Sequence, residues 1–352
     1  MLLVLNAGSS SLKAMIFAMD LTPLARFMVT EIGASSRLVT PEATRTIHAP
    51  DHRAALDQMI GAARAMGYAW GDFRAAAHRV VHGGAEFTCA QRVGPEVLAG
   101  ITALCTLAPL HNPANLAGIA AVAELAPALP QYVSFDTAFH ATNPAVATRF
   151  ALPQGVADDL RRYGFHGLSY AALVQNITPL PKRLLAFHLG NGASACAILD
   201  GRSVGTTMGY SPVDGLVMGT RGGAMDPMGV LELAARFGID GARGILNQQS
   251  GLKGLAGESD MARLLARSDE AARFAVEMFC TAAARQAAGL IPLMGGVDAV
   301  AFTGGIGENA AHVRNKILSL LEFLGELPIH VVAAEEERQI ARDAKLLMEA
   351  GK

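Results

Sequence analysis

The sequence predicts an α/β protein built from two related domains. Its 352 residues exceed the roughly 250–300 residues that one hydrophobic core usually serves, so two domains are expected. A pattern of apolar run, small polar turn and second apolar run occurs near the N-terminus and again about half a chain later. In each half, a further apolar run leads into polar residues, which is typical of a strand that ends at a ligand site in an open α/β sheet.

The repeated pattern predicts two β-hairpins, each with a turn of the size that binds a phosphate. Its three parts are Leu2–Leu5, Asn6–Ser11 and Leu12–Phe17 in the first half, and Arg183–Phe187, His188–Ser194 and Ala195–Leu199 in the second half. Hairpins are common in proteins, so on the residues alone two unrelated hairpins remain the alternative to a duplication.

Two more strands and a set of helices complete the expected elements. The strands are Gln131–Phe135 and Ala299–Phe302, and the helices are Pro95–Leu104, Pro113–Leu125, Met228–Phe237, Asp269–Leu290, Ala310–Leu321 and Glu335–Met348. Asn309 is expected to cap the helix that follows it, because a side-chain amide oxygen there can accept a free helical N–H. The domain junction is expected near Asp136–Thr142, where the first set of strands ends.

Composition excludes several classes of protein. Hydrophobic residues make up 51% and charged residues 17%, so a large core is expected and disorder is not. A net charge of -2 disfavours nucleic acid as a partner, and no apolar run is long enough for a membrane span. The four cysteines form no C-x-x-C pair, and the first residues lack the basic region of a signal peptide. We therefore expect a cytoplasmic protein.

A glycine-rich segment, Gly304–Gly307, lies where a predicted strand meets a predicted helix. Glycines let a backbone approach a phosphate closely enough for its N–H groups to bind the oxygens. No Gly-Lys-Ser/Thr follows, so the segment is not a Walker A loop. A tight turn with a purely steric role remains the alternative.

Two arginines are each set among glycines. Arg79 lies in His78–Gly84, and Arg221 lies in Met218–Gly223. A guanidinium group binds carboxylates and phosphates through two parallel hydrogen bonds, and two such groups could neutralise a phosphoryl group during its transfer. The alternative for each is an ordinary surface arginine.

Two histidines and one aspartate stand in expected turns. His166 lies in Tyr163–Gly167 and His188 opens the second hairpin turn, although a single histidine often only satisfies a core hydrogen bond. Asp136 follows a strand, where a carboxylate can orient Mg²⁺ or an attacking oxygen, or can merely cap a turn. No zinc-binding histidine spacing is present.

These segments together resemble the acetate and propionate kinase family of the actin-like ATPase and sugar-kinase superfamily. The matching segments occur in the family's order and are Asn6–Lys13, His78–Gly84, Leu107–Pro113, Phe135–His140, Tyr163–Ser169, His188–Ser194, Gly219–Arg221 and Phe302–Asn309. The resemblance implies a duplicated ribonuclease-H-like fold with the active site in an interdomain cleft. It also implies a first domain of residues 1–139 and 337–352 and a second domain of residues 140–336.

The resemblance implies a role for each matching residue. Arg79 and Arg221 would bind the carboxylate and the moving phosphoryl group, and Asp136 would be the catalytic carboxylate. His166 would stabilise the transition state and His188 would help to hold the phosphoryl region. The implied substrate residues are Arg79, Val81, Leu110, Phe165 and Pro212. The implied nucleotide residues are Lys13, His188, Gly190, Asn191, Gly192, Asp260, Gly305, Ile306 and Asn309.

The family further implies reversible phosphoryl transfer from ATP to acetate, with Mg²⁺ or Mn²⁺, in a homodimer. Asn6 and Glu336 are the implied metal residues, with Glu335 and Glu337 as alternatives for the glutamate. Of Ser259–Ala262, only Asp260 matches the family pattern that contacts adenosine, so base selectivity stays open. A kinase for propionate or another short acid and a non-catalytic ATP-binding protein are the two alternatives in function.

Overall fold

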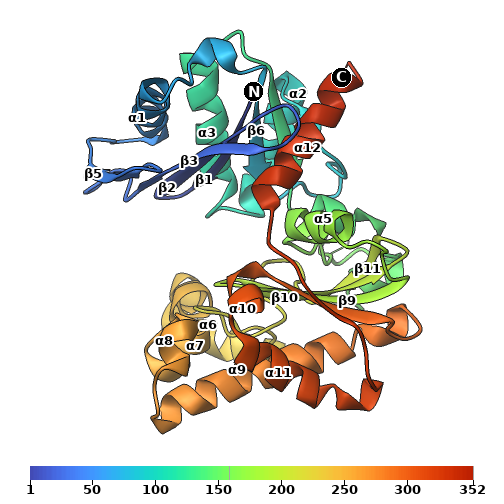
Figure 1. Cartoon of the computed structure of the whole chain (residues 1–352). Helices are drawn as coiled ribbons and strands as arrows, with labels where there is room; N and C mark the ends of the chain where they lie inside the picture. The colour runs from blue at the N-terminus through green and yellow to red at the C-terminus, as the bar shows by residue number, and fades with distance from the viewer. Residues whose placement is uncertain (158, 352) are drawn as a thin grey trace. The chain divides into compact units, whose positions relative to one another are not determined.

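The computed structural model describes residues 1–157 and 159–351 and divides the chain into two compact units (Figure 1). Unit 1 comprises Met1–Ala138 and the C-terminal segment that starts at Glu335, and unit 2 comprises Phe139–Ala334. The chain therefore passes from one unit to the other after residues 138 and 334. The division expected from the sequence has these boundaries after residues 139 and 336.

The same five-strand pattern occurs in both units. The sheet of unit 1 has the order β5-β4-β3-β2-β1-β6-β8-β7, and that of unit 2 has the order β11-β10-β9-β12-β13. In each, three antiparallel strands (β3-β2-β1 and β11-β10-β9) continue into two parallel ones (β6-β8 and β12-β13). This repetition confirms the duplicated α/β fold that the two hairpins predict.

The strands have the following bounds. They are β1 Leu2–Gly8, β2 Ser11–Phe17, β3 Pro23–Thr30, β4 Arg37–Val39, β5 Thr44–Thr46, β6 Ala75–Val80, β7 Gln91–Arg92, β8 Gln131–Phe135, β9 Arg183–Leu189, β10 Ala193–Leu199, β11 Arg202–Thr206, β12 Ala299–Thr303 and β13 Ile329–Val331. Strands β1 and β9 thus each begin a unit's repeated pattern.

The α-helices have the following bounds. They are α1 His52–Ala65, α2 Pro95–Ala103, α3 Asn112–Leu125, α4 Ala145–Thr148, α5 Gly167–Asn176, α6 Pro227–Gly244, α7 Gly251–Ala256, α8 Met261–Leu265, α9 Glu270–Ala288, α10 Gly304–Asn309, α11 Ala311–Leu320 and α12 Glu336–Glu349. Short 3₁₀ turns lie at Trp70–Asp72, Leu104–Thr106, Ala138–Thr142, Ile291–Leu293 and Glu322–Leu324, and a π-helical turn at Ile245–Gln249 follows α6. No helix in residues 1–157 and 159–351 has the length and apolar character that a membrane span needs.

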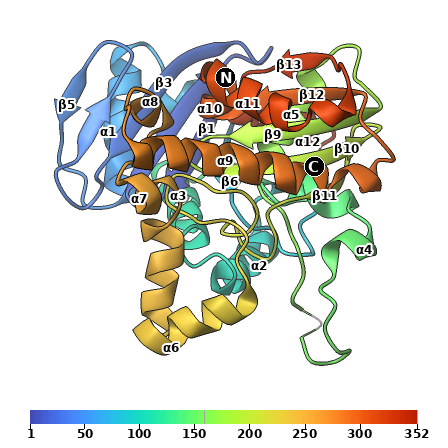
Figure 2. The same ribbon diagram turned by 90° about the horizontal axis from the view of Figure 1, so that it is seen from below.

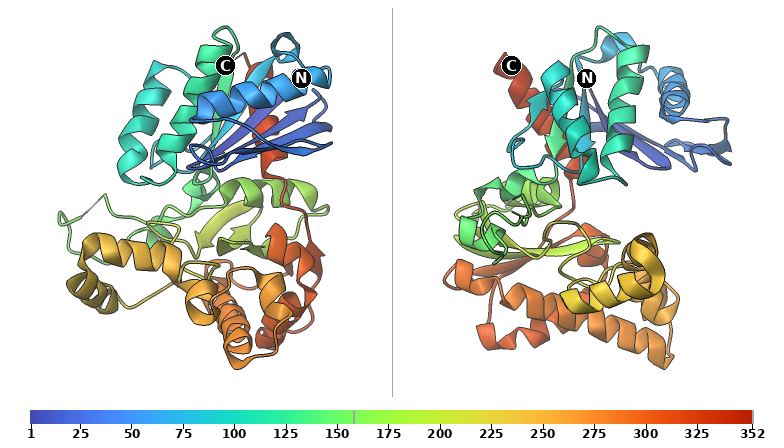
Figure 3. Two further views of the ribbon diagram at one scale, coloured as in Figure 1. Left: turned by 90° about the vertical axis from the view of Figure 1, so that its left-hand side faces the viewer. Right: turned by 180° about the vertical axis from the view of Figure 1, so that it is seen from behind.

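In unit 1, helices cover both faces of the sheet. Side chains alternate between the faces of a strand, and Leu3 and Leu5 of β1 pack with residues of α1 and α3, such as Leu56 and Val122. Helix α12 packs on β1, β6 and β8 from the other face, as Figure 3 (left) shows behind the sheet. The C-terminal segment of the chain is therefore part of the N-terminal unit's core.

In unit 2, helix α5 covers one face of the sheet, where Tyr170 and Leu173 pack on Leu184 and Ile198. Helix α9 lies on the other face, with α11 beside it. Its buried residues recur at helical spacing, from Ala272 to Ala287, which is the core-helix pattern that the sequence predicted.

The predicted hairpins, the two further strands and the six helices are confirmed, with ends that shift by a few residues. The prediction that Asn309 caps the following helix is wrong. Asn309 ends α10, and its side-chain amide donates to the carbonyl of Gly305 at 2.9 Å, while Ala310 precedes α11 without a side-chain cap. The first turn is also tighter than predicted, because β1 continues through Asn6 to Gly8.

Buried histidines make stability depend on pH, and His78 and His140 are two of them. His78 hydrogen-bonds Gln131 at 2.8 Å, and His140 bonds Ser203 and the carbonyl of Phe165. Burial lowers the pKa of each to about 4, from 6.5 in the unfolded chain. Acidification from pH 6.5 toward 4 therefore protonates the unfolded chain first and favours it, by about 2 kcal/mol per histidine at pH 5.

We therefore expect the urea midpoint of unfolding to fall between pH 7 and pH 5. A His78→Gln variant keeps a polar group for Gln131 but lacks this titration, so its midpoint should fall less over the same range. An equal fall in the variant and the natural chain would contradict the assignment to His78. Circular dichroism at several urea concentrations measures both midpoints.

Candidate active site

In unit 1, an arginine and an aspartate meet where two parallel strands end. Val80 of β6 is paired with Phe135 of β8, so Arg79 and Asp136 lie at the same edge of the sheet. Arg79 binds Asp136 through two groups: its Nε lies 3.0 and 3.1 Å from the two carboxylate oxygens, and its Nη2 lies 2.5 Å from one of them. The Asp136 side chain is 2% exposed and that of Arg79 is 22% exposed. The pair is therefore a largely buried, bidentate ion pair.

Two opposing effects act on this pair. Burial raises the pKa of the Asp136 carboxyl, and the nearby charge of Arg79 opposes that rise. Burial also acts against the charged form of Arg79, but the attraction of Asp136 and Glu336 outweighs it and raises the arginine pKa. Glu336 further raises the pKa of Asp136, so the two carboxylates repel each other. A cation near both would relieve that repulsion.

Two buried asparagines of α3 hold the loop that follows Arg79. Asn115 accepts from the N–H of Val81 and donates to the carbonyl of Ala7 at the end of β1. Asn112 accepts from the N–H of His82 and donates to its carbonyl. These bonds tie together the ends of β1 and β6, which carry Asn6 and Arg79. Sequence reasoning missed both asparagines, although Asn112 lies inside the matching segment Leu107–Pro113.

The three candidate glutamates differ in their surroundings. Glu335 forms an ion pair with Arg338 at 2.7 Å, whereas Glu336 and Glu337 act on Arg79. Of the three, Glu336 alone is among the groups that shift the pKa of both Arg79 and Asp136. Its position at the start of α12 thus favours Glu336 over its neighbours.

In unit 2, two histidines stack on each other. The rings of His166 and His188 have centroids 4.1 Å apart and an interplanar angle of 25°. His166 precedes α5 in the left-handed conformation (φ 61°), and its Nδ1 lies 2.9 Å from Ser194 Oγ, which also bonds the hydroxyl of Tyr170 at 2.7 Å. His188 Nδ1 lies 2.8 Å from Ser169 Oγ. The serine hydroxyls, which sequence reasoning missed, thus set the orientation of both rings.

Arg221 lies beside these histidines at the turn of the second hairpin. A methyl group added at Gly192 would lie 3.1 Å from His166 Nε2 and 3.8 Å from Arg221 Nη1. The side chains of His166 and Arg221 therefore both approach the same glycine of the hairpin turn. Arg221 donates to the carbonyl of Pro212 at 3.1 Å, and burial lowers its pKa. Within the described part of the chain it forms no ion pair with a carboxylate. It is therefore a partly buried cation whose charge is left for an anion.

A Gly192→Ala variant tests whether this close approach is needed. The new methyl would press on His166 Nε2 and Cε1 at 3.1 and 3.4 Å, tighter than an ordinary contact. The family resemblance implies that His166 stabilises a transition state, and a small displacement of such a group is costly, so we expect kcat to fall roughly tenfold to hundredfold. A Gly61→Ala change at an exposed position of α1, where nothing lies within 4 Å of the added methyl, is the matched control and should leave kcat unchanged. Full activity of Gly192→Ala would show that the histidine tolerates displacement.

A pocket of about 480 Å³ lies in the same unit. Its lining brings together six residues nominated for the nucleotide, namely Gly190, Asn191, Asp260, Gly305, Ile306 and Asn309. Ser259, Met261, Ala262, Leu265 and Ala310 complete the lining. The volume lies within the range of small-molecule sites, roughly 300–1,000 Å³, and the lining combines apolar side chains with a few polar ones.

Glycines let the pocket walls form. Gly304 has a φ of +79°, and a Cβ there would lie 2.7 Å from the carbonyl oxygen of Leu189, so only glycine fits between β9 and α10. A Cβ at Gly219 would collide with the side chain of Asn191, and the N–H of Gly219 donates to the Asn191 carbonyl. The loop that carries Arg221 is thereby attached to the pocket wall. Asp260 caps α8 by accepting from the N–H of Arg263.

The nominated residues divide between the units. Unit 1 contains Asn6, Lys13, Arg79, Val81, Leu110, Asp136 and Glu336, and unit 2 contains Phe165, His166, His188, Gly190, Asn191, Gly192, Pro212, Arg221, Asp260, Gly305, Ile306 and Asn309. Of the four apolar residues expected around a methyl group, unit 1 contains Val81, which is buried, and Leu110, which is 52% exposed. Unit 2 contains Phe165, which is buried, and Pro212, which is partly buried. Asn6 and Lys13 are paired across β1 and β2.

Two repeated α/β units, a glycine-walled pocket in unit 2 and a guanidinium group in each unit are the features that the family resemblance implies. A sequence model described as the acetokinase family matches residues 1–343, and the chain therefore belongs to that family. The resemblance inferred from the motifs is confirmed.

Known proteins agree with this assignment. The acetate kinase of Methylocella silvestris is 41% identical over 351 residues, covering 92% of this chain and 87% of the relative. The crystal structure of Porphyromonas gingivalis acetate kinase matches with a TM-score of 0.91 and 33% identity, over 99% of each chain. The structure of a propionate kinase from Francisella tularensis matches with a TM-score of 0.92 and 33% identity, over 97% of this chain and 98% of that one.

Proposed function

We propose that this chain catalyses reversible transfer of the γ-phosphoryl group of ATP to acetate, giving acetyl phosphate and ADP. The observation that carries the proposal is Arg221, a partly buried cation with no carboxylate partner among the described residues. It lies beside stacked His166 and His188, and its loop is attached to the glycine-walled pocket. A phosphoryl group is the anion that such a setting favours.

The reaction needs positioning more than proton transfer. Acetate is ionised at neutral pH, because the pKa of a carboxylic acid lies far below 7. One of its oxygens forms a bond to the γ-phosphorus while the bond from that phosphorus to the β–γ bridging oxygen breaks, and ADP leaves with the electron pair. Asp136 therefore holds Arg79 and orients reacting groups, without removing a proton.

The charge of the moving group is shared between cations and hydrogen-bond donors. Arg221 and His166 stabilise the oxygens of the phosphoryl group in the transition state, and His188 holds the same region through the stack. The nucleotide occupies the pocket lined by Asn191, Gly305 and Ile306.

A divalent metal ion, Mg²⁺ or Mn²⁺, fits the donors in unit 1. Asp136 and Glu336 repel each other, and Asn6 adds an amide oxygen, which matches the oxygen ligands that Mg²⁺ takes beside substrate phosphates and waters. No group of three or more His, Cys, Asp or Glu side chains that could hold a metal ion occurs in residues 1–157 and 159–351. In this proposal substrate oxygens and waters therefore supply the remaining ligands. When bound, the ion neutralises phosphate charge.

Val81, Leu110, Phe165 and Pro212 form the contact for the methyl group of acetate in this proposal. Propionate is the alternative acceptor, since one solved relative is a propionate kinase. One methylene in an apolar pocket changes selectivity by about 1–3 kcal/mol, so both acids are expected to react to some extent.

A hydroxamate assay tests the proposal directly, because hydroxylamine traps acyl phosphates. Purified protein is incubated with ATP, MgCl₂ and acetate, propionate or butyrate, and hydroxamate is measured for each acid. Acetate should give the highest kcat/KM. A higher value for propionate would transfer the proposal to that acid. ATP binding without hydroxamate from any acid would indicate a non-catalytic ATP-binding protein and overturn it.

We also propose a cytoplasmic homodimer, with helix α6 in the interface. Met228, Leu231, Phe237 and Ile239 expose between 57% and 69% of their surface, and Figure 2 shows α6 projecting away from the sheet of unit 2. The element is kinked at Gly238 (φ 71°), so the first three of these side chains precede the kink and Ile239 follows it. Exposed apolar side chains gathered in one element are typical of an interaction surface. Light scattering after gel filtration should give a dimer for the natural chain and a monomer for Phe237→Glu. A dimeric Phe237→Glu variant, or a monomeric natural chain, would contradict this proposal.

A further inference from the structure

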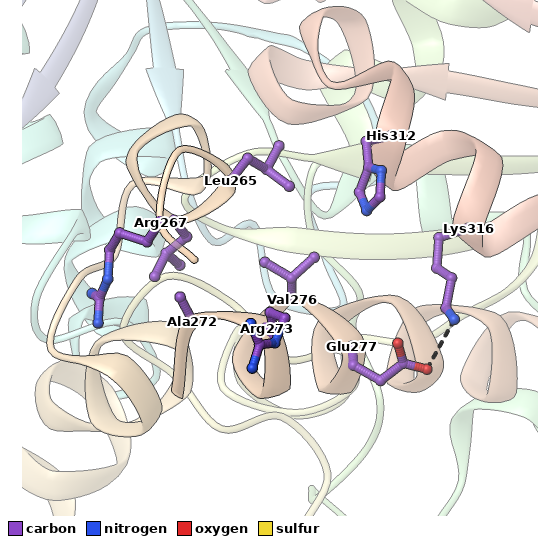
Figure 4. Close-up of a pocket in the computed structure, with 9 residues that line it drawn as sticks. Leu265, Arg267, Ala272, Arg273, Val276, Glu277, His312 and Lys316 are labelled. Carbon is purple, nitrogen blue, oxygen red and sulfur yellow. Dashed lines mark ion pairs between the residues drawn. The ribbon is translucent and has the colours of Figure 1, made fainter. Parts of the chain in front are cut away.

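A second cavity in unit 2 lies outside the groups assigned so far. It has a volume of about 550 Å³ and is formed by α8, the following loop, α9 and α11 (Figure 4). Its lining residues are Leu264, Leu265, Arg267, Ala272, Arg273, Val276, Glu277, His312 and Lys316. Leu264, Ala272 and Val276 are buried and make an apolar floor, and cationic side chains from three chain segments surround it.

The charges around the cavity do not cancel. Arg267 pairs with Asp269 at 2.8 Å, and Lys316 pairs with Glu277 at 3.0 Å, as the dashed line in Figure 4 shows. Arg273 donates to the carbonyl of Ser268 and has no ion pair with a carboxylate in the part of the chain described. A guanidinium carries five N–H donors, so several remain for a ligand. The cavity therefore has one positive charge that no ion pair compensates, and the ring nitrogens of His312 add hydrogen-bonding atoms to its lining.

The cavity shares a wall with the nucleotide pocket. Leu265 lines both cavities, and the short helix α8 presents Met261 and Ala262 to the nucleotide pocket and Leu264 to the second cavity. Helix α11 likewise provides His312 and Lys316, and it follows Ala310 of the nucleotide pocket directly. Helix α8 has only five residues, so a shift of its residues in one cavity also shifts its residues in the other. A ligand in the second cavity is therefore expected to change the shape of the nucleotide pocket.

We propose that this second cavity is a regulatory site for a small organic anion with an apolar body, and that its occupancy is linked to nucleotide binding through α8. The apolar floor takes the body of the ligand, and Arg273 takes its carboxylate, sulfonate or phosphate group. The volume accommodates a molecule of metabolite or small-cofactor size. The site itself is independent of the proposed kinase activity, while the linkage rests on the assignment of the nucleotide pocket.

The probe for the site is 8-anilinonaphthalene-1-sulfonate, which has one anionic group, an aromatic body and a fluorescence that rises in apolar surroundings. Its binding is titrated in the presence of saturating ADP, which keeps it out of the nucleotide pocket. Arg273→Gln removes the uncompensated charge. Arg285→Gln is the matched control, because Arg285 is an exposed arginine on the same helix α9 and does not line the cavity. Neither residue belongs to the proposed catalytic machinery.

We expect the natural chain and Arg285→Gln to bind the probe with equal affinity, and Arg273→Gln to bind it at least fivefold more weakly. Equal affinity in all three proteins, or complete displacement of the probe by ADP, would overturn the site. Linkage requires that the probe change the ADP dissociation constant by the same factor as ADP changes that of the probe. An ADP affinity that does not respond to bound probe would overturn the linkage. The titrations of probe and ADP measure binding and need no turnover. A negative hydroxamate assay would therefore count against the proposed kinase activity and not against the second site.

Discussion

The Arg79→Ala variant is expected to lose about a thousandfold or more in kcat and to become much less stable. The loss of turnover follows from removal of a guanidinium that the proposed mechanism places on the substrates. The loss of stability follows from the 2% exposure of Asp136, because a buried carboxylate is left without its bidentate partner. Breaking a buried ion pair on one side typically costs about 3–5 kcal/mol. Hydroxamate formation and urea unfolding measure the two effects.

A double-mutant cycle separates these two effects. Replacing both Arg79 and Asp136 by alanine removes the uncompensated charge, so the double variant should regain much of the stability that either single variant loses. Its turnover should remain as low as that of Arg79→Ala. Arg53→Ala, which breaks an exposed pair with Glu124, is the control and should change stability by under about 1 kcal/mol. Activity that returned with stability in the double variant would reduce Arg79 to a structural residue.

The Arg221→Ala variant is expected to lose turnover on a similar scale, about a thousandfold, while keeping its stability. Arg221 has no carboxylate partner within the described residues, and it donates to the carbonyl of Pro212 and to the sulfur of Met218. Its removal therefore leaves no buried charge behind, and the lost hydrogen bond is worth about 1 kcal/mol. Kinetics with acetate and a urea unfolding curve of the same preparation measure both quantities.

Arg221→Lys refines the test, because lysine keeps the charge but lacks the planar pair of donors. We expect it to recover a minor part of the lost kcat. A strongly destabilised Arg221→Ala variant would show that the arginine is structural, and near-normal kcat would remove it from the mechanism. We thus expect Arg79 to stabilise the fold and Arg221 not to. This difference follows from the partner of each arginine, a buried carboxylate for Arg79 and a carbonyl for Arg221, and not from its sequence motif.

Both arginines lie in segments that contain paired glycines, and the sequence predicts that both bind anions. The structure separates them: Arg79 is bound to Asp136, which lies 57 residues further along the chain, while Arg221 has no carboxylate partner in the described residues. Ion pairing of this kind depends on which strand ends become neighbours in the sheet. The parallel pairing of β6 with β8 decides that, and no local pattern around Arg79 contains it.

What the sequence determined by itself is the set of local elements and the type of residue at each strand end. The alternation of apolar residues, the turn residues of the two hairpins and the glycines beside β12 depend on the backbone preferences of neighbouring residues, so they are readable without tertiary contacts. The tertiary structure alone decided the end of α10 at Asn309, the serine partners of His166 and His188, and the shared wall formed by Leu265. The serine bonds and the shared wall depend on contacts between residues distant in sequence, whose free energies no local preference encodes.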